Sequence, residues 1–340
     1  LRRMLPKEHL WPLDEFWSYH APGERFQKLE PLVRPMETSY GKPTGLEDFL
    51  RKAQAMIYDS ERAMFEAYDR NKYAATGVIH WMLNNPWPSI YWHLYDDYLY
   101  PAGGYFAARK AGEPLHVQYS YDDRSVVVVS TRREKVAGLT ARAELFDFGL
   151  EAVARQEAKV DLEPDGVARA FTLPPLPSEP VATVYFLRLS LRDAGGKELT
   201  SNFYWLPARL STMDWAKVAD TAYAPVASYE DLTALQKLAP VQLEATAARE
   251  TGAGPDRVRV TLHNRTHGLA FQVHLGIRRS GEEDEVLPVL WDDNYLALLP
   301  GESKTLTARY LKGGVLGRQA TLQVDGWNVQ PRAVPIETGR

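Results

Sequence analysis

The chain has 340 residues, of which 45% are hydrophobic and 25% charged, and its formal net charge is −4. This length suffices for two or three domains, and the composition is that of an ordinary soluble globular protein. The near-neutral charge argues against a nucleic-acid or membrane-surface partner, no apolar run approaches a membrane span, and the absence of cysteine excludes disulfides, thiolate metal sites and a cysteine nucleophile.

The first 45 residues are rich in proline and aromatic residues and predict an irregular segment. The chain begins Leu-Arg-Arg, with no apolar core after the two arginines and no Met at position 1, so we expect an internal piece of a longer protein without a signal peptide. A helix is expected from about residue 46 to residue 71, because Thr44 and Glu47 have capping-box spacing and apolar residues then recur with a 3.6-residue period. That apolar stripe consists of Phe49, Ala53, Met56, Ile57, Met64, Ala67 and Tyr68.

An apolar run at residues 77–83 predicts a buried strand, and the prolines at 86 and 88 predict a loop after it. A second, shorter helix is expected over residues 104–110. Helix, strand, loop and helix in this order are typical of an α/β barrel, and a whole barrel needs about 250 residues. We therefore predict that residues 1–113 are the C-terminal remnant of a (β/α)8 barrel.

From Pro114 onward the hydrophobic period changes to two, which indicates β-strands. Strands over 125–130, 139–145 and 185–191 predict a β-sandwich at residues 114–208. Residues 209–225 predict a linker that packs through Trp215 and Tyr223. A second sandwich is expected at residues 226–340, from alternating runs at 258–262, 271–277, 306–310 and 320–324.

Tryptophans 81, 87 and 92 crowd into twelve residues at the end of the predicted barrel strand. Aromatic faces stack on the apolar faces of sugar rings, and barrel active sites lie where the strands end. Trp81 is thus a candidate sugar platform, and the amide of Asn84 could bind a hydroxyl group. The alternative interpretation is that these aromatic residues are core and interface.

Carboxylates and histidines give no comparable signal. Glu37 lies in the irregular segment and not after an apolar strand, and the paired aspartates read as turn formers. His263 and His267 are four residues apart but fall in a turn, and no glycine-rich phosphate loop is present. His80 is expected to be buried and hydrogen-bonded. These residues therefore give no signal for a catalytic pair, and we expect no metal and no cofactor.

Several motifs carry a resemblance to a known family. The run Thr76–Trp87 resembles the last barrel strand of the exo-β-D-glucosaminidase branch of glycoside hydrolase family 2, and Ala111–Tyr119 resembles the passage into its fourth domain. Trp291–Tyr295 with Leu299–Glu302 resembles a segment of the final domain that this branch shares with β-mannosidases, and Gly326-Trp327-Asn328 resembles its closing strand. The similarity covers nearly the whole chain.

This resemblance implies five domains in the full enzyme, the last two being immunoglobulin-like β-sandwich domains. It implies that two glutamates on earlier barrel strands act with retention of configuration, and that neither has a counterpart here. The chain alone is then expected to be inactive, with no catalytic residue of its own. Trp81 would be the sugar platform, and Asn84 and Trp87 would shape the rim of the substrate-binding site.

Three interpretations of function stay open. The first is a portion of an exo-β-D-glucosaminidase that binds chitosan-type oligosaccharides through the complete enzyme. The second is a β-mannosidase, exo-acting or endo-acting on glycoprotein glycans, which Asp293-Asn294-Tyr295 favours. The third is a non-catalytic carbohydrate-binding or structural module. By resemblance we expect a periplasmic or extracellular location, and the oligomeric state is left open.

Overall fold

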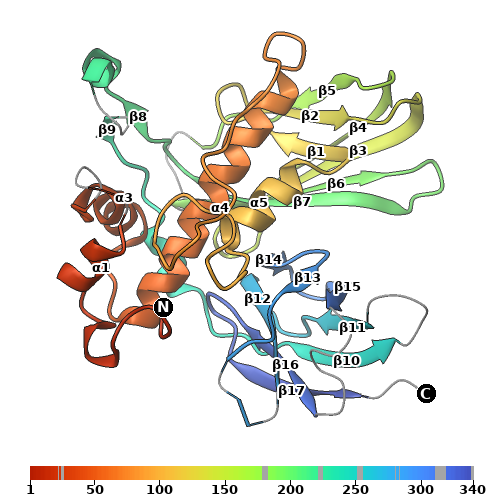
Figure 1. Cartoon of the computed structure of the whole chain (residues 1–340). Helices are drawn as coiled ribbons and strands as arrows, with labels where there is room; N and C mark the ends of the chain where they lie inside the picture. Colours follow the sequence, from red (N-terminus) through yellow and green to blue (C-terminus); the bar gives the residue numbers. More distant parts are fainter. Residues whose placement is uncertain are drawn as a thin grey trace. The chain divides into compact units, whose positions relative to one another are not determined.

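The computed structural model describes residues 1–21, 23, 27–177, 183–220, 225–250, 256–279, 281, 282, 284–310 and 319–337. The chain forms two compact units (Figure 1). The first comprises Leu1–Trp81 and Ala107–Lys237, and the second comprises Met82–Phe106 and Leu238–Arg340. None of the helices in the described ranges is long and apolar enough to cross a membrane. The four domain ranges expected from the sequence stay a prediction.

The prediction that the first 45 residues are irregular was wrong, because they contain helices α1 and α3. Two prolines obscured α3: Pro31 lies in its first turn, where no N–H donor is needed, and Pro35 lies inside it. Glu37 is therefore helical. The helices are α1 (Glu15–Tyr19), α3 (Glu30–Tyr40), α4 (Leu46–Arg70) and α5 (Gly103–Ala111), with 3-10 turns η1 (Lys7–His9), η2 (Trp215–Asp220) and η3 (Thr233–Lys237).

Both helices predicted after residue 45 are confirmed as α4 and α5, but the N-terminal cap of α4 differs from the prediction. Gly45 is the capping residue and makes no side-chain bond. Asp48, and not Glu47, reaches back: its carboxylate accepts hydrogen bonds from Thr44 N at 2.9 Å and Thr44 Oγ1 at 3.3 Å. The acidic side chains of the first turn also face the positive end of the helix dipole.

Of the predicted apolar stripe of α4, only Phe49 is buried. Ile57 and Met64 of the apolar stripe are 36% and 38% exposed. The other buried residues of α4 follow at spacings of three or four and include three charged ones: Lys52, Ala55, Tyr58, Arg62 and Glu66. Hydrophobic periodicity failed here because a polar network, described below, holds this side of the helix in the first unit.

The strand predicted at residues 77–83 is also absent. Residues 77–80 have no regular secondary structure and lie in no ladder in the described part of the chain. A strand exists only through its neighbour's hydrogen bonds, and among the described residues Met82 and Leu83 pair with residues 92–95 of their own loop without forming a strand. Exposure nevertheless alternates as in a strand: Ile79 is 92%, Trp81 71% and Leu83 60% exposed, with less exposed residues between them.

The first unit contains a β-sandwich, as predicted. A three-stranded sheet of order β1-β2-β5 and a four-stranded sheet of order β4-β3-β6-β7 share one hydrophobic core. Alternate residues of β3 and β6 enter this core, such as Leu139 and Leu187, which are 1% and 0% exposed. The strands are β1 (Leu115–Tyr119), β2 (Ser125–Ser130), β3 (Val136–Phe146), β4 (Ala152–Leu162), β5 (Val167–Thr172), β6 (Val184–Arg192) and β7 (Glu198–Pro207).

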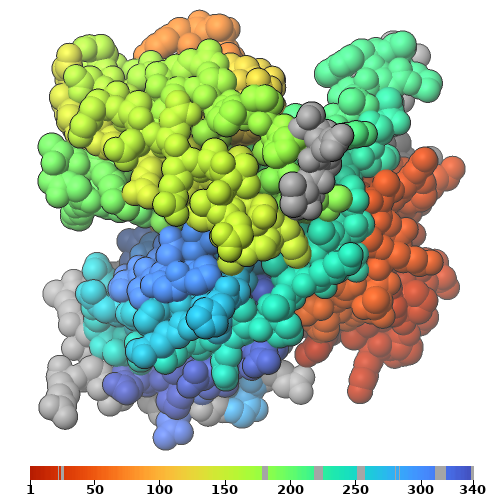
Figure 2. All heavy atoms as spheres, turned by 180° about the vertical axis from the view of Figure 1, so that it is seen from behind, coloured from red at the N-terminus to blue at the C-terminus, as the bar shows by residue number. Residues whose placement is uncertain are grey.

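A short hairpin follows, of β8 (Thr212–Met213) and β9 (Val226–Ser228). It projects from the rest of the first unit and is green to teal in Figures 1 and 2. The predicted packing of this linker through Trp215 is wrong, because Trp215 is 75% exposed. Tyr223 lies outside the described residues.

The second unit contains eight strands of order β13-β15-β11-β10-β17-β16-β12-β14. A parallel contact of two residue pairs between β10 and β17 joins two groups of four strands. All four runs predicted in this part are confirmed, within β11, β12, β15 and β16. The strands are β10 (Glu244–Glu250), β11 (Asp256–His263), β12 (Ala270–Arg279), β13 (Val289–Trp291), β14 (Leu296–Leu298), β15 (Ser303–Tyr310), β16 (Ala320–Asp325) and β17 (Arg332–Glu337).

Candidate functional site

The predicted sugar-binding residues lie on an irregular segment, residues 77–99, which we call the aromatic segment. Trp81, the last residue of this segment in the first unit, is 71% exposed. Asn84 and Trp87 lie in the second unit; Asn84 is exposed and Trp87 is 40% exposed. All three side chains are thus open to solvent. Their role in substrate binding stays a prediction.

The second-unit part of the aromatic segment is a closed loop. The amide N of Tyr95 donates to the carbonyl oxygen of Leu83 at 2.9 Å, and Asn84 forms an isolated bridge with Tyr95. Inside the loop, Asn85 Nδ2 lies 2.9 Å from His93 Nδ1. Burial lowers the pKa of His93, which favours a neutral ring. The loop therefore holds its shape through internal hydrogen bonds.

In the first unit, two side chains of α4 contact the residues that precede Trp81 in the sequence. His80 Nδ1 lies 3.3 Å from Glu61 Oε2, and the two side chains are only 13% and 11% exposed. The hydroxyl of Tyr68 donates to the carbonyl oxygen of Thr76 at 3.4 Å. Burial raises the pKa of Glu61, and His80 partly offsets that effect. The side chain of His80 is thus largely shielded and lies beside a carboxylate, and the expected hydrogen bond stays a prediction.

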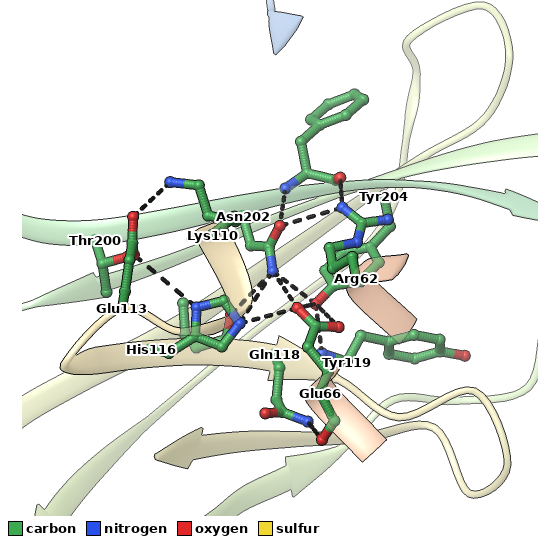
Figure 3. Close-up of polar contacts among 12 residues, drawn as sticks. Arg62, Glu66, Lys110, Glu113, His116, Gln118, Tyr119, Thr200, Asn202 and Tyr204 are labelled. Atoms are coloured by element: carbon green, nitrogen blue, oxygen red, sulfur yellow. Dashed lines mark hydrogen bonds and ion pairs between the residues drawn. The ribbon is translucent and has the colours of Figure 1, made fainter. Parts of the chain in front are cut away.

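Sequence reasoning missed a buried polar network that links α4 to strands β1 and β7 (Figure 3). At its centre is Glu66, which is 2% exposed. Its carboxylate accepts hydrogen bonds from Tyr204 OH at 2.8 Å and Asn202 Nδ2 at 2.7 Å, and it lies 2.9 Å from His116 Nε2. Glu66 O also accepts from Gln118 Nε2 at 2.7 Å.

His116 lies between two carboxylates. Glu113 Oε2 is 3.9 Å from its Nδ1, an ion-pair distance, and Glu113 Oε1 accepts from Lys110 Nζ at 2.7 Å. Burial alone would lower the pKa of His116, but Glu113 and Glu66 outweigh it and raise it. Burial likewise opposes ionisation of Glu113, yet His116, Lys110 and Thr200 lower the pKa of Glu113 to about 2. The network therefore holds a charged pair inside the protein.

Arg62 also belongs to the network and lies one helical turn before Glu66 on α4. Its guanidinium carbon lies 3.9 Å from the centre of the Tyr204 ring, and Nη2 donates to Asp59 Oδ1 at 2.8 Å. Asp59 also accepts from Tyr121 OH at 2.8 Å. Burial raises the pKa of Asp59, against the attraction of Arg62. Because Arg62 and His116 are 0% exposed, these groups cannot reach a substrate, and they hold α4 on the sandwich.

The sequence contained a signal for this network. In the strand sequence Leu-His-Val-Gln-Tyr, His116 and Gln118 are two residues apart and therefore face the same side. Arg62 and Glu66 are four apart on α4 and also share a face. Two polar pairs of this kind in buried elements predict a shared polar interface.

A further polar cluster lies in the second unit. His274 Nε2 is 2.8 Å from Tyr100 OH, and its Nδ1 is 3.2 Å from Asp325 Oδ1. Both ring nitrogens are thus engaged with protein groups. Across the described residues, no group of three His, Asp or Glu side chains is arranged to hold a metal ion.

Two family profiles match the sandwiches. One, described as the exo-β-D-glucosaminidase Ig-fold domain, matches residues 221–329, and one described as the mannosidase Ig/CBM-like domain matches residues 122–208. Together with the relatives described below, they define the class as the sandwich-bearing part of a multidomain glycoside hydrolase. The chain belongs to the exo-β-D-glucosaminidase and β-mannosidase branch of glycoside hydrolase family 2, and it corresponds to a C-terminal part of the enzymes of this branch.

Three similar proteins show which members of this branch the chain resembles. The chain is 44% identical, over 98% of its length, to the exo-β-D-glucosaminidase of Streptomyces avermitilis. It matches the crystal structure of the Amycolatopsis orientalis exo-chitosanase with a TM-score of 0.91 at 36% identity, covering 98% of this chain. It is 26% identical over 94% of its length to the Lilium longiflorum mannosylglycoprotein endo-β-mannosidase. The chain spans 38%, 40% and 37% of these proteins, respectively.

Proposed function

We propose that this chain is the C-terminal portion of a retaining exo-β-D-glucosaminidase that acts on chitosan-type oligosaccharides. The observation that carries the proposal is the 44% identity, over 98% of the chain, to a protein named exo-β-D-glucosaminidase. A second support is the A. orientalis exo-chitosanase complex with PNP-β-D-glucosamine, which this chain matches with a TM-score of 0.91 at 35% identity. Export to the periplasm or the extracellular space is part of the proposal, and cell fractionation tests it.

The two carboxylates that a retaining glycosidase requires are proposed to lie in the part of the enzyme that precedes this chain. Two carboxylates of α4 support this, since each is engaged by internal partners. Glu66 binds Tyr204 and Asn202, and Asp59 binds Arg62. We accordingly propose that the chain alone does not hydrolyse glycosides.

We also propose that α4, α5 and the aromatic segment are the last piece of a (β/α)8 barrel. The support is exposed apolar side chains in the first unit: Ile57 and Met64 on α4 and Ile79 on the aromatic segment are between 36% and 92% exposed. Exposed apolar surface of this extent marks an interaction site. In the proposed enzyme the remaining barrel strands and helices cover it.

Trp81 is proposed to be the sugar platform, with Asn84 and Trp87 at the rim. Replacing Trp81 by Ala in the full-length enzyme should raise KM for a chitosan oligosaccharide roughly two- to tenfold, the worth of one aromatic contact. Trp215→Ala is a matched control, because Trp215 is also exposed, at 75%, but lies on the β8–β9 hairpin. An unchanged KM in Trp81→Ala would contradict this role.

A β-mannosidase is the second candidate, favoured by the 26% identity to the endo-β-mannosidase and by the mannosidase profile over residues 122–208. The test is hydrolysis of an aryl β-D-glucosaminide and an aryl β-D-mannoside by the full-length protein. We expect turnover of the glucosaminide and little of the mannoside. The reverse preference would replace the proposal by this candidate, and no turnover of either would favour a non-catalytic carbohydrate-binding or structural module.

A further inference from the structure

The contact between Glu61 and His80 connects the middle of α4 to the residue before Trp81. Glu61 Oε2 is 3.3 Å from His80 Nδ1. That oxygen is buried and accepts no well-aligned hydrogen bond from any described residue. A buried carboxylate with so few partners costs free energy, so α4 would be more stable with an apolar residue at this position. Such a cost indicates a role other than stability.

The surroundings of His80 show what the contact does. Residues 77–80 lie in no ladder among the described residues, so backbone pairing does not orient them. Exposure nevertheless alternates from one residue to the next along this segment. Ile79 is 92% and Trp81 71% exposed, whereas the side chain of His80 is 13% exposed. Holding the His80 ring against α4 therefore turns the Trp81 ring outward.

We propose that Glu61 is a positioning residue for sugar binding, which acts through His80 to fix the orientation of the Trp81 ring. This inference rests on the proposed function, since it requires Trp81 to be a sugar platform. Stacking on a sugar requires the indole face to be preorganised, because an unconstrained ring pays the entropy of ordering on binding. Glu61 touches no substrate in this account.

The test is a double-mutant cycle in the full-length enzyme, with KM and kcat for a chitosan oligosaccharide as readouts. Glu61→Ala should raise KM roughly two- to tenfold with little change in kcat, because it loosens the same aromatic contact that Trp81→Ala removes. The double variant should have the KM of Trp81→Ala alone, since two residues that act through one contact are not additive. Glu61→Gln keeps the shape and a polar atom for His80, so it should restore KM to near the native value.

A matched control is Glu47→Ala, on the same helix, with a side chain that is 71% exposed and 3.6 Å from Arg2. Its KM should equal that of the native enzyme. Multiplicative effects of Glu61→Ala and Trp81→Ala would overturn the inference and leave the platform role of Trp81 intact. A lowered melting temperature with unchanged KM in Glu61→Ala would also overturn it. An unchanged KM in Trp81→Ala refutes the platform itself, and the positioning role with it.

Discussion

Replacing Glu66 by Ala tests whether the buried network holds α4 on the first sandwich. The variant leaves the hydroxyl of Tyr204, the amide of Asn202 and the ring of His116 without their shared acceptor, all of them buried. Removing one partner of a buried charged pair costs about 3–5 kcal/mol. For a unit of this size each kcal/mol lowers Tm by about 2–4 °C, so we expect the Tm of the first unit to fall by roughly 6–20 °C.

The assay is differential scanning calorimetry of the whole chain, with the transitions of the two units followed separately. Glu66→Gln should give a smaller loss, because it keeps the shape and one acceptor oxygen but not the charge. Glu163→Ala is the control on the same sandwich: its side chain is 73% exposed and pairs with Lys135, and exposed pairs contribute little. If Glu66→Ala lowers Tm no more than Glu163→Ala, the network does not hold the helix.

The first unit should be most stable between pH 4.5 and 6.5. The contribution of Glu113 to the free energy of unfolding is complete above its ordinary pKa of 4.5 and is lost as pH falls towards its lowered pKa of about 2. The contribution of His116 is complete below its ordinary pKa of 6.5 and is lost as pH rises through its raised pKa. The midpoint of urea unfolding, measured as a function of pH, checks this. In His116→Gln the midpoint should no longer fall above pH 6.5, and a pH curve identical to that of the native chain would contradict the role of His116. Gly41→Ala should cost about 1–3 kcal/mol, because Gly41 has a φ of +86° and an added Cβ would lie 2.1 Å from Gln236 Nε2. Gly45→Ala should cost less, since nothing lies within 4 Å of its added Cβ, and equal urea midpoints for the two variants would refute the argument.

Periodicity predicted the sandwiches well, since a strand with one buried face alternates visibly. In β3, Leu139, Ala141, Ala143 and Leu145 are all buried at 2% exposure or less. The same reasoning found α4 but assigned its buried face wrongly. It assumes that the apolar side is inside, and here the inward side carries Arg62 and Glu66. The partners of Glu66, His116 and Asn202, are 50 and 136 residues away in sequence.

The candidate site was predicted only in part. Sequence singled out Trp81, Asn84 and Trp87 and expected a shielded His80, whose side chain is 13% exposed, but it predicted a strand where the structure has an irregular segment. Strand propensity is expressed only when a neighbouring strand pairs with it. The Glu61–His80 contact was invisible for another reason: it joins an acidic residue in the middle of a helix to a residue 19 positions later in a segment without regular structure.

The measurement that tests the central claim most directly compares two purified proteins on an aryl β-D-glucosaminide: this 340-residue chain and the full-length enzyme that carries it. The account predicts turnover by the full-length enzyme and none by the chain alone, because the catalytic carboxylates belong to the preceding part. Turnover by the chain alone would place a catalytic carboxylate within these 340 residues and would contradict the account.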